Sequence, residues 1–430
     1  LFKIKRLNFY AKIWCNQDKY VFLHKILIVM KIDNNFSPIL RPAIRECDEN
    51  IASHSLQELY EIKKNRLGLS DRAIQKLLGI QLNSLKPILE GTAKQINLVN
   101  FIKLANFIGI EFEQLASSYL PTMDADVIGE IQDARDAGYL VEMFDLQTLK
   151  KCGFLTSENS TKNIVSRIKK FFNLKSLYDF ASDDLGRAFS RTKKTSNEKM
   201  REFWIRSAYT QFISIDNPNK YSRSKLIEII PKIKPYSRNE EYGLITVAKA
   251  LYSIGVTVIY QPCLSKEQVR GATLCINEKP CIVISDLGKK YPTLWFSLMH
   301  ELYHVLYDLE DISRKCYHIS SDYGDLMLTN EDRADYFAQQ ILLSDDKLNF
   351  IEGYINSHIN VLSYAQQWGI HPSIIYSTYC YKYDAWAKFN KYIPNTTKAL
   401  KTINMNPFES SELVQNAKQI KKLLIVNNYE

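Results

Sequence analysis

Residues 294–306 read LWFSLMHELYHVL, and this stretch decides the fold around it. Apolar residues occur on nearly every side of the helix that it predicts, so this helix belongs in the protein interior. We expect the helix to begin near Pro292, because proline is favoured at the first helical position. His300 and His304 are four residues apart, which is about 400° around a helix with 3.6 residues per turn. Both imidazoles therefore project from one face and can share one metal ion.

A buried pair of histidines with a neighbouring glutamate is costly without partners, whereas a bound cation turns the histidines into ligands. Glu301 follows the first histidine and is placed to hold and deprotonate a metal-bound water. A catalytic zinc site has three protein ligands and an open position for water. Glu331 is the candidate third ligand, because Thr329 and Asn330 can cap a helix that starts with it. Asp335 lies one turn further on the same face, where it can accept the second N–H of a ligating histidine.

The segments before this central helix alternate between helical and strand patterns. A helix is predicted over 244–254, and strands are predicted over 256–260, 271–276 and 281–284, where β-branched and aromatic residues are frequent. A small sheet is therefore expected to pack against the helix that carries the two histidines.

The HExxH motif at His300, followed 31 positions later by ExxADxFA at Glu331, resembles the ImmA/IrrE-type metallopeptidases. Residues 269–272, 282–285 and 365–372 are also similar to that family. The resemblance implies a zincin-like α+β domain that binds one Zn2+ through His300, His304 and Glu331, with Glu301 as general base. It implies metal-assisted hydrolysis of a peptide bond in a partner protein, such as a repressor or a toxin-related protein. Tyr303 stands where the family usually has glycine, and a narrower approach to the metal is expected there.

Alternatives to a hydrolytic site stay open. The motif can arise by chance, or the site can bind metal and serve as a sensor or a fold element. His318 could polarise a substrate carbonyl, but it is interpreted as an exposed histidine in a loop. Tyr307, one turn after the second histidine, is interpreted as a core residue.

A second motif lies among four short helices predicted between residues 55 and 120. The order from Ser70 to Ile80, followed by Leu85, Ile88 and Gly91, resembles the Cro/repressor-type helix-turn-helix. The resemblance implies that the helix after Gly79 enters the major groove of double-stranded DNA, and the residues expected to face DNA are Gln81, Asn83, Ser84 and Lys86. Pro87 and Gln75 depart from the usual pattern. The alternative is a helical protein-interaction module that keeps the fold without the DNA contacts.

Composition is typical of a globular protein, with 46% hydrophobic residues in 430 and a formal net charge of +9. This charge permits a nucleic-acid or acidic partner without requiring one. Eight cysteines without a CxxC pair favour a reducing compartment. The early apolar run over 20–30 is shorter than the roughly 20 residues that span a bilayer, so we expect a cytoplasmic protein without a membrane segment.

Five segments follow from these patterns. They are an N-terminal extension (1–50), a helix-turn-helix domain (55–120), a helical connecting region (121–235), a metallopeptidase-like domain (236–380) and a polar C-terminal tail (381–430). The predicted function is a zinc-dependent metallopeptidase-type regulator tethered to DNA. The alternative is a non-catalytic DNA-binding transcriptional regulator or antitoxin whose peptidase fold senses or binds.

Overall fold

The computed structural model describes residues 55–93, 95–111, 115, 125–156, 160–181, 195–264, 269–321, 331–403, 405, 407–409 and 412–425. The chain divides into two compact units, Leu1–Ile131 and Gln132–Glu430. The predicted extension over 1–50 lies outside the described residues, as do Thr329 and Asn330.

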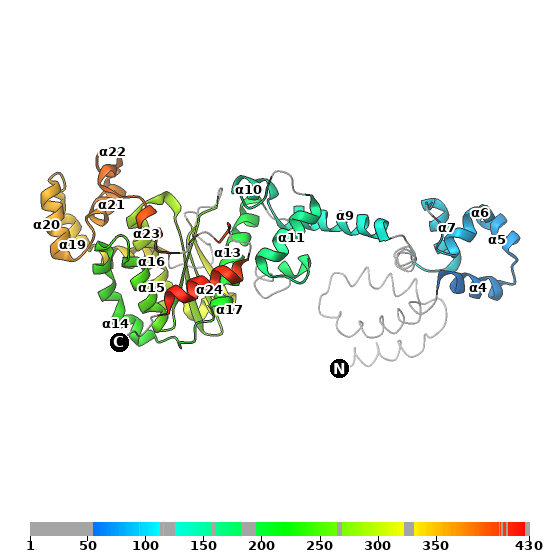
Figure 1. Ribbon diagram of the computed structural model, residues 1–430, viewed down its shortest axis with the longest axis horizontal. Helices are drawn as coiled ribbons and strands as arrows, with labels where there is room; N and C mark the ends of the chain where they lie inside the picture. Colours follow the sequence, from blue (N-terminus) through cyan, green and yellow to red (C-terminus); the bar gives the residue numbers. More distant parts are fainter. Residues whose placement is uncertain are drawn as a thin grey trace, which may run out of the picture. The chain divides into compact units, whose positions relative to one another are not determined.

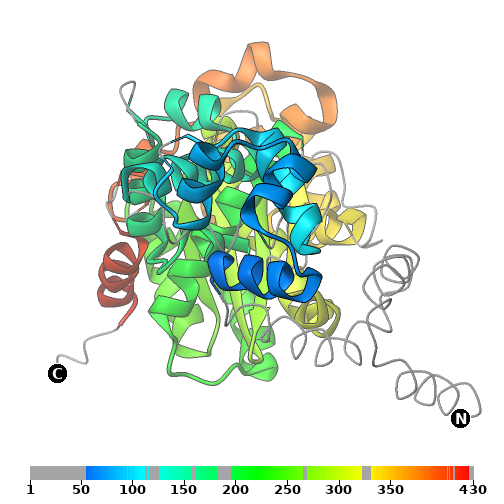
Figure 2. The same cartoon turned by 90° about the vertical axis from the view of Figure 1, so that its right-hand side faces the viewer.

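The described part of the first unit contains the four helices that the sequence predicts (Figures 1 and 2). They are α4 (Leu56–Leu67), α5 (Asp71–Leu78), α6 (Leu82–Leu89) and α7 (Leu98–Ile108). Ser70 caps α5, and Gly79 ends it in the left-handed region at φ 61°, where a side chain would be strained. The buried side chains of Tyr60, Ile74 and Leu104 form part of one small core.

One four-stranded sheet lies in the second unit, so the described residues form a mixed α+β structure. Its strands are β1 (Thr257–Gln261), β2 (Val269–Ile276), β3 (Lys279–Ser285) and β4 (Tyr317–Ser321), in the order β1-β3-β2-β4. β1 is parallel to β3, whereas β2 is antiparallel to both of its neighbours. The three predicted strands are confirmed, and β4 is additional.

The central helix α16 (Tyr291–Tyr307) packs against β2 and β3 on one side and against α18 (Glu331–Leu342) on another. Pro292 lies in its first turn, as predicted. Ala334 and Ala338 of α18 are fully buried, and their small side chains allow the two helices to approach closely. The helix with the histidine motif is therefore held between the sheet and α18.

The other helices of the described residues complete the two units. They are α9 (Ala125–Met143), α10 (Leu146–Lys151), α11 (Thr161–Phe172), α13 (Ser196–Ile215), α14 (Arg223–Ile233), α15 (Gly243–Ser253), α17 (Leu309–Lys315), α19 (Asp345–Glu352), α20 (His358–Trp368), α21 (Pro372–Tyr383), α22 (Trp386–Phe389), α23 (Thr397–Leu400) and α24 (Leu413–Leu424). Short 3-10 helices are η2 (Leu177–Ala181), η3 (Lys234–Arg238), η4 (Leu287–Lys289) and η5 (Asn390–Tyr392). None of the helices in these ranges combines the length and the apolar character needed to cross a bilayer.

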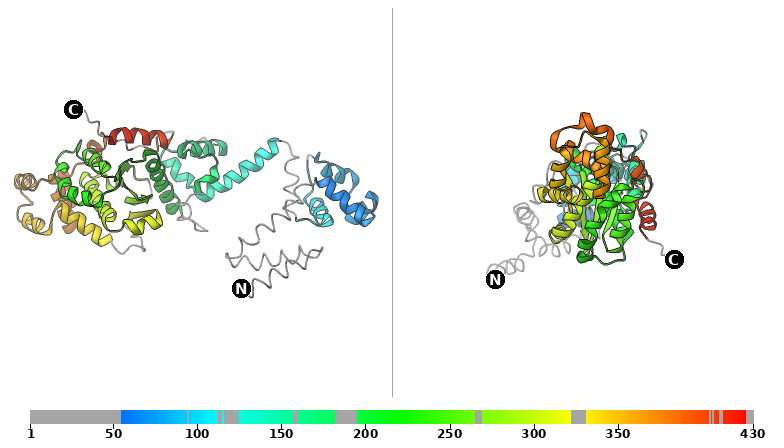
Figure 3. Two further views of the ribbon diagram at one scale, coloured as in Figure 1. Left: turned by 90° about the horizontal axis from the view of Figure 1, so that it is seen from below. Right: turned by 90° about the vertical axis from the view of Figure 1, so that its left-hand side faces the viewer.

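The C-terminal segment, predicted as a polar tail over 381–430, instead contains a helix with a buried face. Helix α24, red in Figure 3, packs against α13. Leu413, Ala417, Ile420 and Leu424 are buried at intervals of three or four residues. Lysine and asparagine dominate the composition between them and obscure this narrow apolar stripe. One hydrophobic core thus includes side chains from all three segments that the sequence analysis separates, at 121–235, 236–380 and 381–430.

Candidate metal centre

Two imidazole rings converge on one face of α16. His300 and His304 are both buried, and their Nε2 atoms lie 3.2 Å apart. Their separation of four residues is slightly more than one helical turn, so the rings lie side by side without any distortion of the helix. The predicted sharing of one face is therefore confirmed.

Glu331 lies at the start of α18 and faces both rings. Its Oε2 is 3.4 Å from the Nε2 of His300, and its Oε1 is 3.4 Å from the Nε2 of His304. The ligand atoms of these three residues all lie within 4.8 Å of one another. Ligands about 2.0–2.2 Å from a tetrahedral zinc ion are separated by roughly 3.3 Å, which agrees with these distances. The three side chains that the sequence selected thus form a group that can hold a metal ion.

Each histidine is oriented by a carboxylate behind it. The Nδ1 of His300 lies 2.8 Å from Oδ1 of Asp335, as the sequence predicts. The Nδ1 of His304 lies 2.8 Å from Oδ2 of Asp308, which the sequence analysis missed although it follows His304 by one helical turn. An Nδ1–H that donates to a carboxylate leaves the lone pair of a neutral imidazole on Nε2. Two such lone pairs facing each other fit a bound cation.

The same contacts alter the pKa values of these three side chains. Burial lowers the pKa of His300, but the hydrogen bonds to Asp335 and Glu331 outweigh it and raise this pKa to about 10. Burial likewise lowers the pKa of His304, and the hydrogen bonds to Asp308 and Glu331 raise it to about 9. Burial raises the pKa of Glu331, yet hydrogen bonds from three histidines hold it well below its ordinary value. A metal ion must therefore displace protons from this cluster.

Glu301 lies beside the sheet and is completely buried. Its Oε2 accepts a 2.7 Å hydrogen bond from Oγ1 of Thr273 on β2, whereas its Oε1 has no hydrogen-bond partner. A β-carbon at Gly271 would lie 2.4 Å from Oε1, so the absence of a side chain there leaves room for the carboxylate. An acceptor oxygen without a donor is the group that a general base needs.

The interpretation of His318 as an exposed residue in a loop is wrong. The residue lies on β4, its exposed fraction is 1%, and its Nε2 is 2.6 Å from Oε1 of Glu331. Its ring centroid is 4.5 Å from that of His304. The polar His318 between the apolar Tyr317 and Ile319 is the alternation that indicates a strand. A segment of five residues is too short for this alternation to distinguish an edge strand from a loop.

Two tyrosines flank the motif. Tyr303 is buried against Phe337 of α18, with ring centroids 5.7 Å apart. Tyr307 was expected in the core, but 56% of it is exposed. It lies at the last residue of α16, where few neighbouring elements remain to cover it. The prediction that Tyr303 narrows the approach to a metal stays a prediction.

The residues predicted to face DNA all lie in the first unit. Gln81 precedes α6, and Asn83, Ser84 and Lys86 belong to it. All four are exposed, so none of them is required for the core. Lys86 also lies 3.7 Å from Glu90, an exposed ion pair that costs little to separate.

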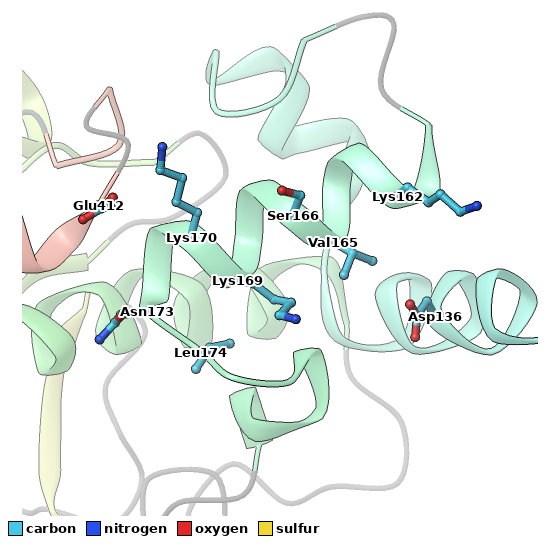
Figure 4. A pocket seen from close by; sticks show the side chains of 9 residues that line it. All are labelled: Asp136, Lys162, Val165, Ser166, Lys169, Lys170, Asn173, Leu174 and Glu412. Carbon is cyan, nitrogen blue, oxygen red and sulfur yellow. The ribbon is translucent and has the colours of Figure 1, made fainter. Parts of the chain in front are cut away.

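A groove of about 490 Å³ lies on α11, and none of its lining residues belongs to the candidate metal centre (Figure 4). Lys162, Lys169 and Lys170 line it together with Asp136 and Glu412. Their ammonium groups point in different directions in Figure 4, so they do not converge on one anion. The chemistry-bearing side chains gather instead between α16, α18 and the sheet.

No protein-family model, curated protein or solved structure matches the chain. The residues of the site and their geometry therefore carry the functional argument.

Proposed function

We propose that this chain is a zinc-dependent metallopeptidase-type regulator that hydrolyses a peptide bond in a partner protein. The observation that carries the proposal is the convergence of His300, His304 and Glu331, with a carboxylate behind each imidazole. The HExxH and ExxADxFA motifs, which resemble those of ImmA/IrrE-type peptidases, agree with this assignment.

The chain's own groups divide the chemical work. A bound zinc ion would supply an activated water and polarise the peptide carbonyl. Glu301, held through Oε2 by Thr273, keeps Oε1 available to accept a proton and to return it to the leaving amine. β4 lies at an end of the strand order, so an extended peptide can pair with its outer edge close to the cluster.

Metal content tests the site. Purified chain should contain about one zinc ion, which the substitution Glu331→Ala should remove because it deletes one of three ligands. The matched control is Asp332→Ala, which changes an exposed carboxylate one residue away. A folded wild type that takes up no zinc would refute the site.

Cleavage tests the reaction. The zinc-loaded chain should cleave one of the proteins encoded by genes adjacent to its own. Glu301→Gln should abolish this cleavage while zinc content is retained, whereas Glu310→Gln, at an exposed position of α17, should leave it unchanged. Zinc binding without cleavage of any of these proteins would favour a sensing or binding role.

Sequence-specific DNA binding is a second candidate function for the first unit. Two observations favour DNA binding: the turn at Gly79 directly before α6, and the exposed polar side chains on α6. Together the two functions describe a DNA-tethered peptidase regulator. Without cleavage, they describe a DNA-binding regulator or antitoxin with a metal-binding domain.

A further inference from the structure

The three candidate ligands differ in how they are held. His300 and His304 are fixed by a regular helix and by Asp335 and Asp308. Glu331 is the first residue of α18, and its side chain has more rotatable bonds than an imidazole. Its carboxylate must lose more conformational freedom before it can serve as a ligand. A contact that orients Glu331 would therefore strengthen metal binding.

His318 makes such a contact from the sheet. Its Nε2 lies 2.6 Å from Oε1 of Glu331, which is a short hydrogen bond. Nδ1 of His318 is buried and has no hydrogen-bond partner. The contact with a carboxylate, an acceptor, therefore places a proton on Nε2.

The ring of His318 is itself rigidly placed. The residue pairs with Thr273 across β2 and β4, and its ring lies edge-on to His304 with centroids 4.5 Å apart. Neither the backbone nor the ring of this buried residue can turn away without breaking the sheet or the packing.

We propose that His318 is a positioning residue, which donates a hydrogen bond to Glu331 and aims its carboxylate at His300 and His304. This inference rests on the proposed metal site. It assigns each of the three ligands an outer partner from the chain: Asp335 for His300, Asp308 for His304 and His318 for Glu331. Ligation by His318 itself fits less well, because 2.6 Å is shorter than the roughly 3.3 Å between ligands of one tetrahedral zinc ion.

Two substitutions of His318 distinguish loss of its hydrogen bond to Glu331 from loss of its side-chain volume. His318→Leu removes the donor, whereas the side-chain amide of His318→Gln can place its nitrogen near the former Nε2 and restore the donor. His358→Leu is the control, because His358 is a partly buried histidine of the same unit that bonds to Tyr376 and not to the site. Zinc affinity is measured by competition with a fluorescent chelator, and the coordination geometry by the visible absorption of the Co2+-loaded chain.

His318→Leu should weaken zinc affinity about 10- to 100-fold and broaden the Co2+ absorption, as loss of an outer partner does. His318→Gln should stay within roughly threefold of the wild type, because a donor is restored. His358→Leu should change neither. Should His318→Leu fail to fold, His318→Asn replaces it, because its shorter side chain cannot place a donor near Glu331.

Wild-type zinc affinity and an unchanged Co2+ spectrum in His318→Leu would overturn the inference and leave the metal site standing. An equally large loss in His318→Gln, with a Co2+ spectrum that shows one nitrogen ligand fewer, would overturn it in favour of direct ligation. A wild type that binds neither zinc nor Co2+ would instead refute the proposed function on which the inference depends.

Discussion

Thr273 and His318 lie directly opposite each other on β2 and β4, and each holds a different carboxylate of the candidate site. Thr273 donates to Oε2 of Glu301 at 2.7 Å, and His318 contacts Oε1 of Glu331 at 2.6 Å. One cross-strand pair therefore positions both the candidate base and the candidate third ligand. A slip of β4 by one residue would turn His318 to the other face of the sheet, so the strand register is part of the site.

Removal of the Thr273 hydroxyl should destabilise the protein through Glu301. Thr273→Val keeps the shape but leaves the buried carboxylate without its donor, at a cost of about 1–3 kcal/mol in the free energy of unfolding. Urea denaturation of the metal-free chain measures this cost. Thr273→Ser retains a hydroxyl, so it should lose much less stability than Thr273→Val. Equal stability of Thr273→Val and the wild type would show that the hydrogen bond contributes nothing.

The two carboxylates behind the histidines should contribute unequally to zinc affinity. The side chain of Asp308 is 5% exposed, whereas that of Asp335 is 50% exposed. Water and salt therefore screen the interaction of Asp335 with His300 more than that of Asp308 with His304. Asp308→Asn should weaken zinc binding about 10- to 100-fold, and Asp335→Asn should weaken it less. Chelator competition measures both affinities. A larger effect at Asp335 would contradict the role assigned to burial.

The C-terminal helix should be required for the stability of the second unit. The side-chain amide of Asn416 on α24 donates to Oε1 of buried Gln211, which in turn donates to Gln261 on β1. Asn416→Ala removes a donor from this buried network and should cost about 1–3 kcal/mol. Urea unfolding followed by tryptophan fluorescence measures the change. Gln415→Ala, at the exposed neighbouring position, should be nearly neutral, and equal effects would contradict the docking of α24.

The first unit should lose stability in acid through Asp71. The hydrogen bond from Lys64 lowers the pKa of Asp71; partial burial opposes this shift, and the hydrogen bond from Tyr60 reinforces it. Because this pKa is lower in the folded state, the ionised group stabilises the fold above its ordinary value near 3.8. The stabilisation disappears as the pH falls through the folded pKa.

Asp71→Asn tests this pH dependence. At pH 6 the variant should show faster amide hydrogen exchange in α4 and α5 than the wild type. Below the folded pKa of Asp71 the two proteins should exchange alike, because the wild-type carboxylate is then protonated. A difference that persists unchanged in acid would exclude titration of Asp71 as its source.

DNA binding by α6 should depend on salt. Lys86→Ala should weaken binding to a duplex from the chain's own promoter and reduce the salt slope by about one, because one phosphate contact is lost. Fluorescence anisotropy at several salt concentrations measures both quantities. Lys150→Ala, which removes an exposed charge from α10 in the second unit, is the control. Affinity indifferent to salt and to Lys86 would favour the protein-interaction module.

The parts of the site that the sequence predicted are those set by spacing along one helix. His300 and His304 share a face because of the helical period, and Asp335 follows Glu331 by one turn for the same reason. Asp308 follows His304 by the same spacing and could have been predicted by this rule. The helix-forming segments of the first unit were likewise marked locally by Ser70, Gly79 and their flanking residues.

Only the tertiary structure decided which helices and strands pack against one another. The pairing of Thr273 with His318 depends on β4 joining β2, and no local period in 317–321 specifies that partner. The docking of α24 on α13 likewise depends on a buried surface built from distant segments. The sequence by itself thus determined the ligand-bearing helices, since helical geometry is local. The orientation of Glu331 and Glu301 was decided by long-range strand pairing and packing, whose free energy belongs to contacts between segments far apart in the chain.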